Sequence, residues 1–257
     1  METLGEDLLL LAVRPNGTLG VAAKLRFALS GSELVRLAAA RRVDIVRGRI
    51  VVLDAAATGD TLLDAALQSM QGGGRPAAAK AWVARQRPGL VERYLDRLAA
   101  PGVIRAERRK ALGIFPATRW VVVDSARLAQ ARERLDAIAS GSGVLGSAQT
   151  AFAGLADAIG LPPLIYPGFA GAAARRNLKK AAKRDRSGGP VADALDATDA
   201  AMRAATSAAV DASIQAATDA AVAASIDAAT QAAVSAATEA AHHAAAHHDG
   251  GAAGGHH

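Results

Sequence analysis

The chain has 257 residues, of which 51% are hydrophobic but only 3% aromatic, and its formal net charge is +6. It contains no cysteine, and its six histidines all lie at or beyond His242. This distribution excludes disulfides, thiolate nucleophiles, Cys/His zinc sites and histidine-based triads from the body of the protein. The hydrophobic core must therefore be built from leucine, valine, isoleucine and alanine.

The charge is unevenly distributed along the chain. Residues 1–190 carry 29 Lys and Arg against 16 Asp and Glu, which gives +13, whereas residues 191–257 carry 1 against 8, which gives −7. A basic body favours anionic partners such as nucleic acid or a lipid surface. The alternative explanation is GC-rich codon usage, which prefers arginine and alanine over lysine and isoleucine.

No targeting segment or membrane-spanning helix is evident. Residues 1–7 carry three acids and no base, unlike a signal peptide. The longest apolar region, about residues 151–174, contains Asp157 and three prolines, whereas a spanning helix needs about 20 apolar residues. We expect a cytoplasmic protein that contacts membranes only peripherally.

In chain order, the first half predicts two units, each a helix followed by a hairpin. The residues Ser30-Gly31-Ser32-Glu33 predict the start of a helix, and a hairpin follows over residues 43–53. A helix capped at Asp60 comes next. The second unit has a helix over residues 88–98 and a hairpin over about 104–120, whose strands flank a basic loop at residues 105–110.

The two units share a short sequence pattern. Leu34-Val35-Arg36-Leu37-Ala38-Ala39 in the first unit matches Leu95-Asp96-Arg97-Leu98-Ala99-Ala100 in the second. Either this is a weak internal repeat, or it is a coincidence in an alanine-rich chain.

The second half predicts helices over residues 125–138 and 148–160, then an apolar, proline-broken loop over residues 160–169. We place the domain boundary at residue 190. Residues 191–257 form an Ala-rich low-complexity tail with a His-rich end, which is either a long helix or disordered. We expect the histidine pairs to bind metal only adventitiously, so no functional metal site is predicted.

The sequence gives no support for catalysis. Asp60 and Asp64 are one helical turn apart, but a helix cap and a surface charge explain them better than a catalytic pair. Glycines 72–74 lack the Gly-Lys-Ser/Thr ending of a phosphate loop. We therefore predict no enzyme and no cofactor.

Two kinds of anionic partner are considered. The helix–hairpin units resemble winged-helix modules, with residues 105–110 as a wing, but acids at Glu33, Glu92 and Asp96 oppose insertion into a DNA groove, so nucleic acid is the less favoured partner. For a membrane surface, an apolar loop lies beside six bases at residues 175–184. The predicted membrane-contact residues are Tyr166, Phe169, Arg175, Arg176, Lys179 and Lys180. A buried loop followed by a solvated helix is the alternative.

Several segments resemble one known family. They are residues 6–12, the Thr58-Gly59-Asp60-Thr61-Leu62-Leu63-Asp64 segment within residues 57–67, residues 90–93 with 102–104, and residues 113–116. Together they resemble the Golgi phosphoprotein 3 family in the form found in high-GC bacteria. The likeness covers about residues 5–215, and the Thr-Gly-Asp segment is its most specific part.

The resemblance implies a mainly α fold, a helical-bundle domain with small β-hairpins. It also implies binding of phosphatidylinositol 4-phosphate and of the cytosolic tails of glycosyltransferases, as eukaryotic members do at Golgi membranes. The hairpin at residues 104–120 would then serve self-association or membrane contact. The resemblance thus implies protein partners and a homo-oligomer as well as a lipid.

This chain lacks the residues that form the lipid-headgroup site in eukaryotic members of the family. That site uses a tryptophan and three arginines, and ungapped matching places them at Val21, Ser30, Pro88 and Val91, so none is retained. Basic residues nearby could form a different anion pocket, since one arginine guanidinium can bind two phosphate oxygens at once. The predicted headgroup residues are Lys24, Arg26, Arg85, Arg87 and Arg93. We expect a non-enzymatic peripheral membrane protein that binds anionic phospholipids, with a nucleic-acid binder and a protein–protein scaffold as the alternatives.

Overall fold

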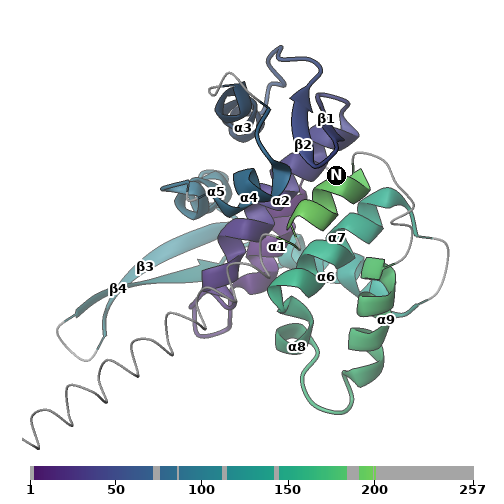
Figure 1. Cartoon of the computed structure of the whole chain (residues 1–257). Helices are drawn as coiled ribbons and strands as arrows, with labels where there is room; N and C mark the ends of the chain where they lie inside the picture. Colours follow the sequence, from purple (N-terminus) through teal and green to yellow (C-terminus); the bar gives the residue numbers. More distant parts are fainter. Residues whose placement is uncertain are drawn as a thin grey trace, which may run out of the picture. The chain divides into compact units, whose positions relative to one another are not determined.

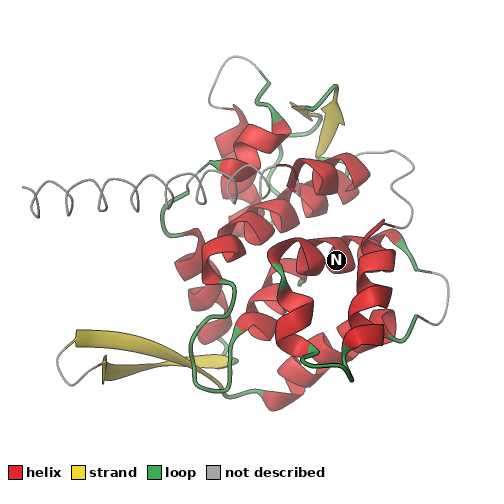
Figure 2. Cartoon of the chain, turned by 60° about the horizontal axis from the view of Figure 1, so that its bottom comes forward, coloured by secondary structure: helices red, strands yellow, loops and turns green. Residues whose placement is uncertain are grey.

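A computed structural model of the chain describes residues 3–71, 76–85, 87–111, 115–141, 145–183, 191–198 and 200. They belong to one compact unit, Met1–Ala205, and a second unit follows from Thr206. The predicted tail structure beyond residue 200, the histidine pairs and glycines 72–74 lie outside the described residues. The first unit is mainly helical with two antiparallel hairpins, which confirms the predicted fold class (Figures 1 and 2).

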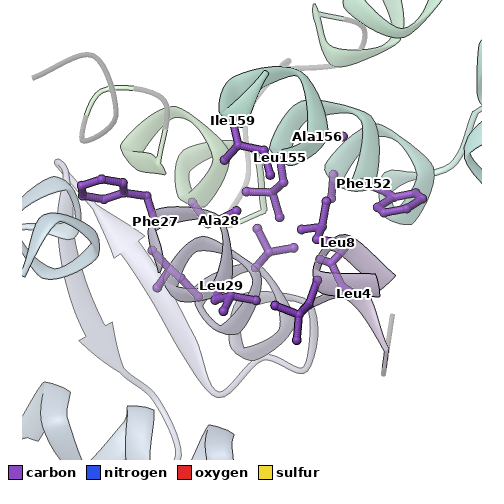
Figure 3. Close-up of a cluster of buried hydrophobic side chains, with 14 of the residues drawn as sticks. Leu4, Leu8, Phe27, Ala28, Leu29, Phe152, Leu155, Ala156 and Ile159 are labelled. Atoms are coloured by element: carbon purple, nitrogen blue, oxygen red, sulfur yellow. The ribbon is translucent and has the colours of Figure 1, made fainter. Parts of the chain in front are cut away.

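The centre of this unit is α1 (Leu4–Ala12), a helix in which every residue except Glu6 is buried. Leu8, Leu9 and Leu10 are fully buried. Such a helix needs partners on every side, and α1 packs against α2 (Ala22–Ala39), α5 (Leu90–Ala99), α6 (Ser125–Ala139) and α7 (Ser147–Ile159). Aliphatic side chains from α1, α2 and α7 meet in the cluster of Figure 3, with Phe27 and Phe152 at its edges.

The helix α2 starts eight residues before the predicted position, so the prediction that Ser30–Glu33 opens a helix is wrong. These small and polar residues lie inside the helix because they make tertiary contacts. A Cβ atom at Gly31 would lie 2.5 Å from Thr198 Oγ1, so glycine permits a close approach there. Residues 191–198 are helical and bury Ala194 and Leu195. The packed body thus includes residues that the sequence analysis assigned to the tail.

Both predicted hairpins form. Strands β1 (Val43–Val46) and β2 (Arg49–Val52) pair from Val43↔Val52 to Val46↔Arg49. Strands β3 (Ile104–Ala111) and β4 (Phe115–Val122) pair from Ile104↔Val122 to Ala111↔Phe115, and this hairpin projects from the helices (Figure 1). Residues 105–110, predicted as a basic loop, therefore lie in β3. Arginines are compatible with this strand because Arg105, Arg108 and Arg109 are exposed.

The remaining helices are α3 (Thr61–Gln71), α4 (Ala79–Ala84), α8 (Leu161–Ile165) and α9 (Ala172–Lys183). The predicted cap is confirmed, because Asp60 accepts a hydrogen bond from the Leu62 amide at 3.0 Å. The predicted loop at residues 160–169 is wrong for residues 161–165: Pro162 and Pro163 lie in the first turn of α8, where proline's missing N–H costs nothing. None of the described helices is both long and apolar enough to cross a bilayer.

Candidate functional site

One face of α2 carries the centre of the candidate site. Arg26, Ser30 and Glu33 are spaced by four and three residues, so they share one helical stripe. Arg87, from the segment between α4 and α5, reaches this stripe. Its Nη2 donates to Ser30 Oγ at 2.9 Å and to the Glu33 carboxylate, and its guanidinium lies 4.6 Å from the centre of the Trp82 ring.

The carboxylate of Glu33 is unusually placed for a charged group. Its side chain is 1% exposed, and burial raises its pKa to about 7, against the opposing charges of Arg87, Arg93 and Arg36. Within the described part of the chain, Glu33 Oε1 and Arg87 Nε have no hydrogen-bond partner. Arg87 is therefore engaged in an interior ion pair, which separates it from the other predicted headgroup bases.

Three of those other bases are unpaired and face solvent to different extents. Arg26 is partly exposed and stacks on Phe27, with its guanidinium carbon 4.6 Å from the ring centre. Arg85 follows the end of α4, Arg93 lies on α5, and both are exposed. No carboxylate of a described residue pairs with any of the three.

The structure groups only some of the predicted headgroup residues. Arg26 shares the stripe that Arg87 contacts, and Arg93 is close enough to lower the pKa of Glu33. Lys24 lies nine residues before Glu33, about 180° around the helix, so it belongs to the opposite side of α2. Ser30 and the segment before α5, where the family pattern places parts of the headgroup site, are brought into contact by Arg87.

A neighbouring network, centred on Asp60, was missed by sequence reasoning. Asp60 accepts from Arg36 Nη2 at 2.7 Å and from Arg97 Nη1 at 2.6 Å, and Arg97 also pairs with Glu6 at 2.6 Å. Burial acts to raise the pKa of Asp60, but the hydrogen bonds from Arg97 and Arg36 outweigh it and lower this pKa to about 2. Arg36 and Arg97 occupy equivalent positions in the repeated sequence pattern, which is a signal from which this network could have been predicted.

Cavities of about 570 Å³ and 450 Å³ adjoin this network. The larger is lined by Arg36, Arg42 and Arg97, and the smaller by Arg93 and Arg97, with Asp60 in both. The ion pairs already made by Arg36, Arg42 and Arg97 leave Arg93 as the unpaired arginine of the two linings. The Thr-Gly-Asp segment therefore holds helices together beside the unpaired bases.

The predicted membrane-contact residues divide into two groups. The Tyr166 hydroxyl donates to Asp136, Arg132 stacks 4.7 Å from the Tyr166 ring centre, and Arg175 donates to the carbonyls of Tyr166 and Gly168. These contacts build the loop itself. By contrast, the remaining four predicted residues are exposed at the loop and along α9: Phe169, Arg176, Lys179 and Lys180.

The β3–β4 hairpin mixes paired and unpaired charges. Arg105 and Arg109 both pair with Glu107, whereas Arg119 is exposed. The base of the hairpin is fixed to the loop between α1 and α2, because the Trp120 amide donates to Gly17 O at 2.9 Å. Self-association through this hairpin stays a prediction.

These features define a helical protein with a charge-paired interior and a projecting hairpin. The family model of Golgi phosphoprotein 3 matches residues 4–202, which is most of the chain, and the protein belongs to this family. A search of curated proteins found no match. Membership supports a non-enzymatic role of the Golgi phosphoprotein kind.

Proposed function

We propose that this protein binds anionic phospholipid headgroups at a membrane surface, with phosphatidylinositol 4-phosphate as the lipid that family membership favours. The observation that carries the proposal is that Arg26 and Arg93 are not held in ion pairs with described residues. Arg26 is partly exposed and Arg93 is exposed, and neither has a carboxylate partner among the described residues. By contrast, the neighbouring Arg36, Arg87 and Arg97 are paired. The adaptor role toward other proteins stays a prediction of the family resemblance.

Freeing an arginine from an ion pair costs free energy. An arginine held by a carboxylate must lose that partner before it can bind a phosphate, whereas an unpaired arginine offers its donors at once. Arg26 is also oriented by its stacking on Phe27, which reduces the rotamer entropy lost on binding. The Glu33–Arg87 pair on the same stripe of α2 as Arg26 fixes the local geometry, and because burial raises the pKa of Glu33 to about 7, this pair is only partly neutralised at pH 7.

Vesicle co-sedimentation of the full chain tests this function. The vesicles contain phosphatidylcholine alone, phosphatidylcholine with phosphatidylserine, or phosphatidylcholine with phosphatidylinositol 4-phosphate at matched surface charge. We expect binding to both anionic mixtures that weakens with salt, and tighter binding to the phosphoinositide mixture. Equal binding to both would reduce the site to a basic patch, and the absence of binding to either would refute the function.

The matched variants are Arg26→Gln with Arg93→Gln, compared with Arg47→Gln. Each base near an anionic surface contributes about 1 kcal/mol, so losing two weakens binding about 25-fold. Arg47 is exposed in the β1–β2 turn, beyond the far end of the 18-residue α2 from Arg26. Its substitution removes the same charge as either single variant, Arg26→Gln or Arg93→Gln, and should leave binding nearly unchanged, so a loss equal to that of either single variant would contradict the assigned site.

A further inference from the structure

The loop between α8 and α9 exposes an aromatic ring completely. Phe169 is 99% exposed, whereas the other exposed large hydrophobic residues of the described chain, Val46, Leu53 and Val123, are 49–57% exposed. Single exposed hydrophobic residues are ordinary on protein surfaces. A functional inference therefore needs further observations about this loop.

The first observation is that the loop is held in a fixed form. Arg175 Nη1 donates to Gly168 O at 2.8 Å and to Tyr166 O, so one guanidinium ties both sides of the loop. The Ala172 amide donates to Phe169 O at 3.0 Å. Gly168 has a φ of +66°, and Gly171 packs so closely on the Tyr166 backbone that a Cβ atom would clash. The ring is thus presented outward by a rigid frame, and binding through it orders little additional chain.

The second observation is the charge around the loop. Residues 161–184 contain six bases and no acid. Arg176, Lys179 and Lys180 are exposed on α9, and none of them pairs with a described carboxylate. Lys180 lies about 12 Å along the helix from its start. The acid that contacts the loop, Asp136, is already engaged by Arg132 and Tyr166.

The third observation concerns position. Leu164 of α8 packs against Gly20 in the loop between α1 and α2. That loop leads into α2, which carries Arg26 in its second turn. The helix α8, which directly precedes the Phe169 loop, therefore lies next to the segment that leads into α2.

From these observations, we infer that Phe169 inserts into the interfacial layer of an anionic bilayer while Arg176, Lys179 and Lys180 contact its headgroups. An apolar side chain that penetrates the layer and a group of bases that meets the anionic phosphates are the two parts of peripheral membrane binding. The inference rests on the proposed function and adds a second contact, separate from the headgroup residues on α2 and α5. The committed partner is a lipid surface, since the bases surround a single protruding ring rather than an apolar groove.

The first test uses the full chain and vesicles of phosphatidylcholine with phosphatidylserine. Phe169→Ala should weaken co-sedimentation about tenfold, because the burial of one phenyl ring is lost. Leu53→Ala is the control, since it removes another exposed hydrophobic side chain that is remote in sequence. Arg176→Gln should weaken binding about fivefold.

The second test reports the location of the ring. Phe169→Trp should give a fluorescence emission that moves to shorter wavelength with anionic vesicles and is quenched by bromine-labelled acyl chains. The parent protein provides the background from Trp82, which is buried, and Trp120, which is partly buried.

The outcomes separate this inference from the proposed function. If the parent protein binds anionic vesicles, Phe169→Ala binds equally well and Phe169→Trp shows no spectral change, the insertion is wrong and the headgroup function stands. If Phe169→Ala binds more weakly but the tryptophan reporter does not respond, the ring does not enter the bilayer and the inference is overturned. If the parent binds no anionic vesicle, the proposed function and the inference both fail.

Discussion

Arginines that pair with buried carboxylates differ in this protein from surface arginines that pair with no described carboxylate. Arg36 and Arg97 bind Asp60, and Arg127 and Arg134 bind Asp7. The surface bases assigned above to membrane contact, such as Arg93 and Arg176, have no such partner among the described residues. The positive charge of residues 1–190 therefore comes from two groups of basic residues, one paired with carboxylates and one at the surface without a described partner. One joins helices, and only the other is available to a partner.

The arginines that pair with buried carboxylates determine how helices pack. Asp7 lies in the central helix α1 and is 3% exposed, so its charge must be compensated. Arg127 Nη2 reaches it from α6 at 2.6 Å, across 120 residues of sequence, and Arg134 joins from the same helix. These pairs fix the approach of α1 and α6, which hydrophobic packing of leucine and alanine alone specifies less sharply.

The strongest test of the comparison is Asp60→Asn. This change keeps an oxygen for the helix cap but leaves Arg36, which is 8% exposed, without its counter-charge. We expect the free energy of unfolding to fall by about 4 kcal/mol, the usual loss when one partner of a buried pair is removed. Urea denaturation at pH 7 measures it.

The control for that experiment is Asp54→Asn. Asp54 also pairs with an arginine, Arg42, but is 54% exposed, so its loss should cost less than about 1 kcal/mol. The folded-state pKa of Asp60 is about 2, below the ordinary 3.8. Its contribution is thus present above about pH 4 and is lost as pH falls through about 2. Equal destabilisation by both variants would show that burial does not distinguish the two pairs.

A second prediction concerns the interior pair beside the headgroup residues. Burial raises the pKa of Glu33 from 4.5 to about 7, so the folded protein binds more protons than the unfolded chain between these values. Stability from this group is therefore highest at low pH and falls by about 2 kcal/mol between pH 5 and pH 7.

Denaturant titration of the parent and of Glu33→Gln at the two pH values measures this slope. The variant has no titrating group at that position, so its stability should change less over the same range. The six histidines are common to both proteins, and their titration cancels in the difference. Identical slopes would mean that Arg87 keeps the carboxylate ionised throughout and that the pair behaves like that of Asp60.

Most of the fold was predictable because its signals are local. The helices over residues 88–98, 125–138 and 148–160 follow apolar periodicity and are confirmed. The β1–β2 hairpin follows runs of β-branched residues around a turn signal, and the Asp60 cap follows from residue type and position. Each of these depends on residues within a few positions of one another.

The errors arose where a distant segment determines the role of a residue. Ser30–Glu33 has the composition of a helix start, but Arg87 and Thr198 approach from elsewhere and make it the interior of α2. The Asp60 network joins residues 24 and 37 positions apart, and sequence spacing cannot specify such contacts. For the same reason, the list of candidate headgroup bases could not distinguish Arg87, which is paired, from Arg93, which is not.

Arg93→Gln has the smallest expected effect on stability. It also tests directly whether Arg93 belongs to the unpaired bases that bind lipid. Arg93 is exposed and makes no ion pair with a described residue, so the free energy of unfolding should change by less than about 0.5 kcal/mol. The same substitution should weaken binding to phosphoinositide vesicles about fivefold, since a base at the surface is lost. Because Arg93 lowers the pKa of Glu33, its removal should also move the pH-dependent loss of stability to higher pH. A stability loss as large as that of Asp60→Asn would place Arg93 in the group that pairs with carboxylates and leave the proposed lipid site without one of its two bases.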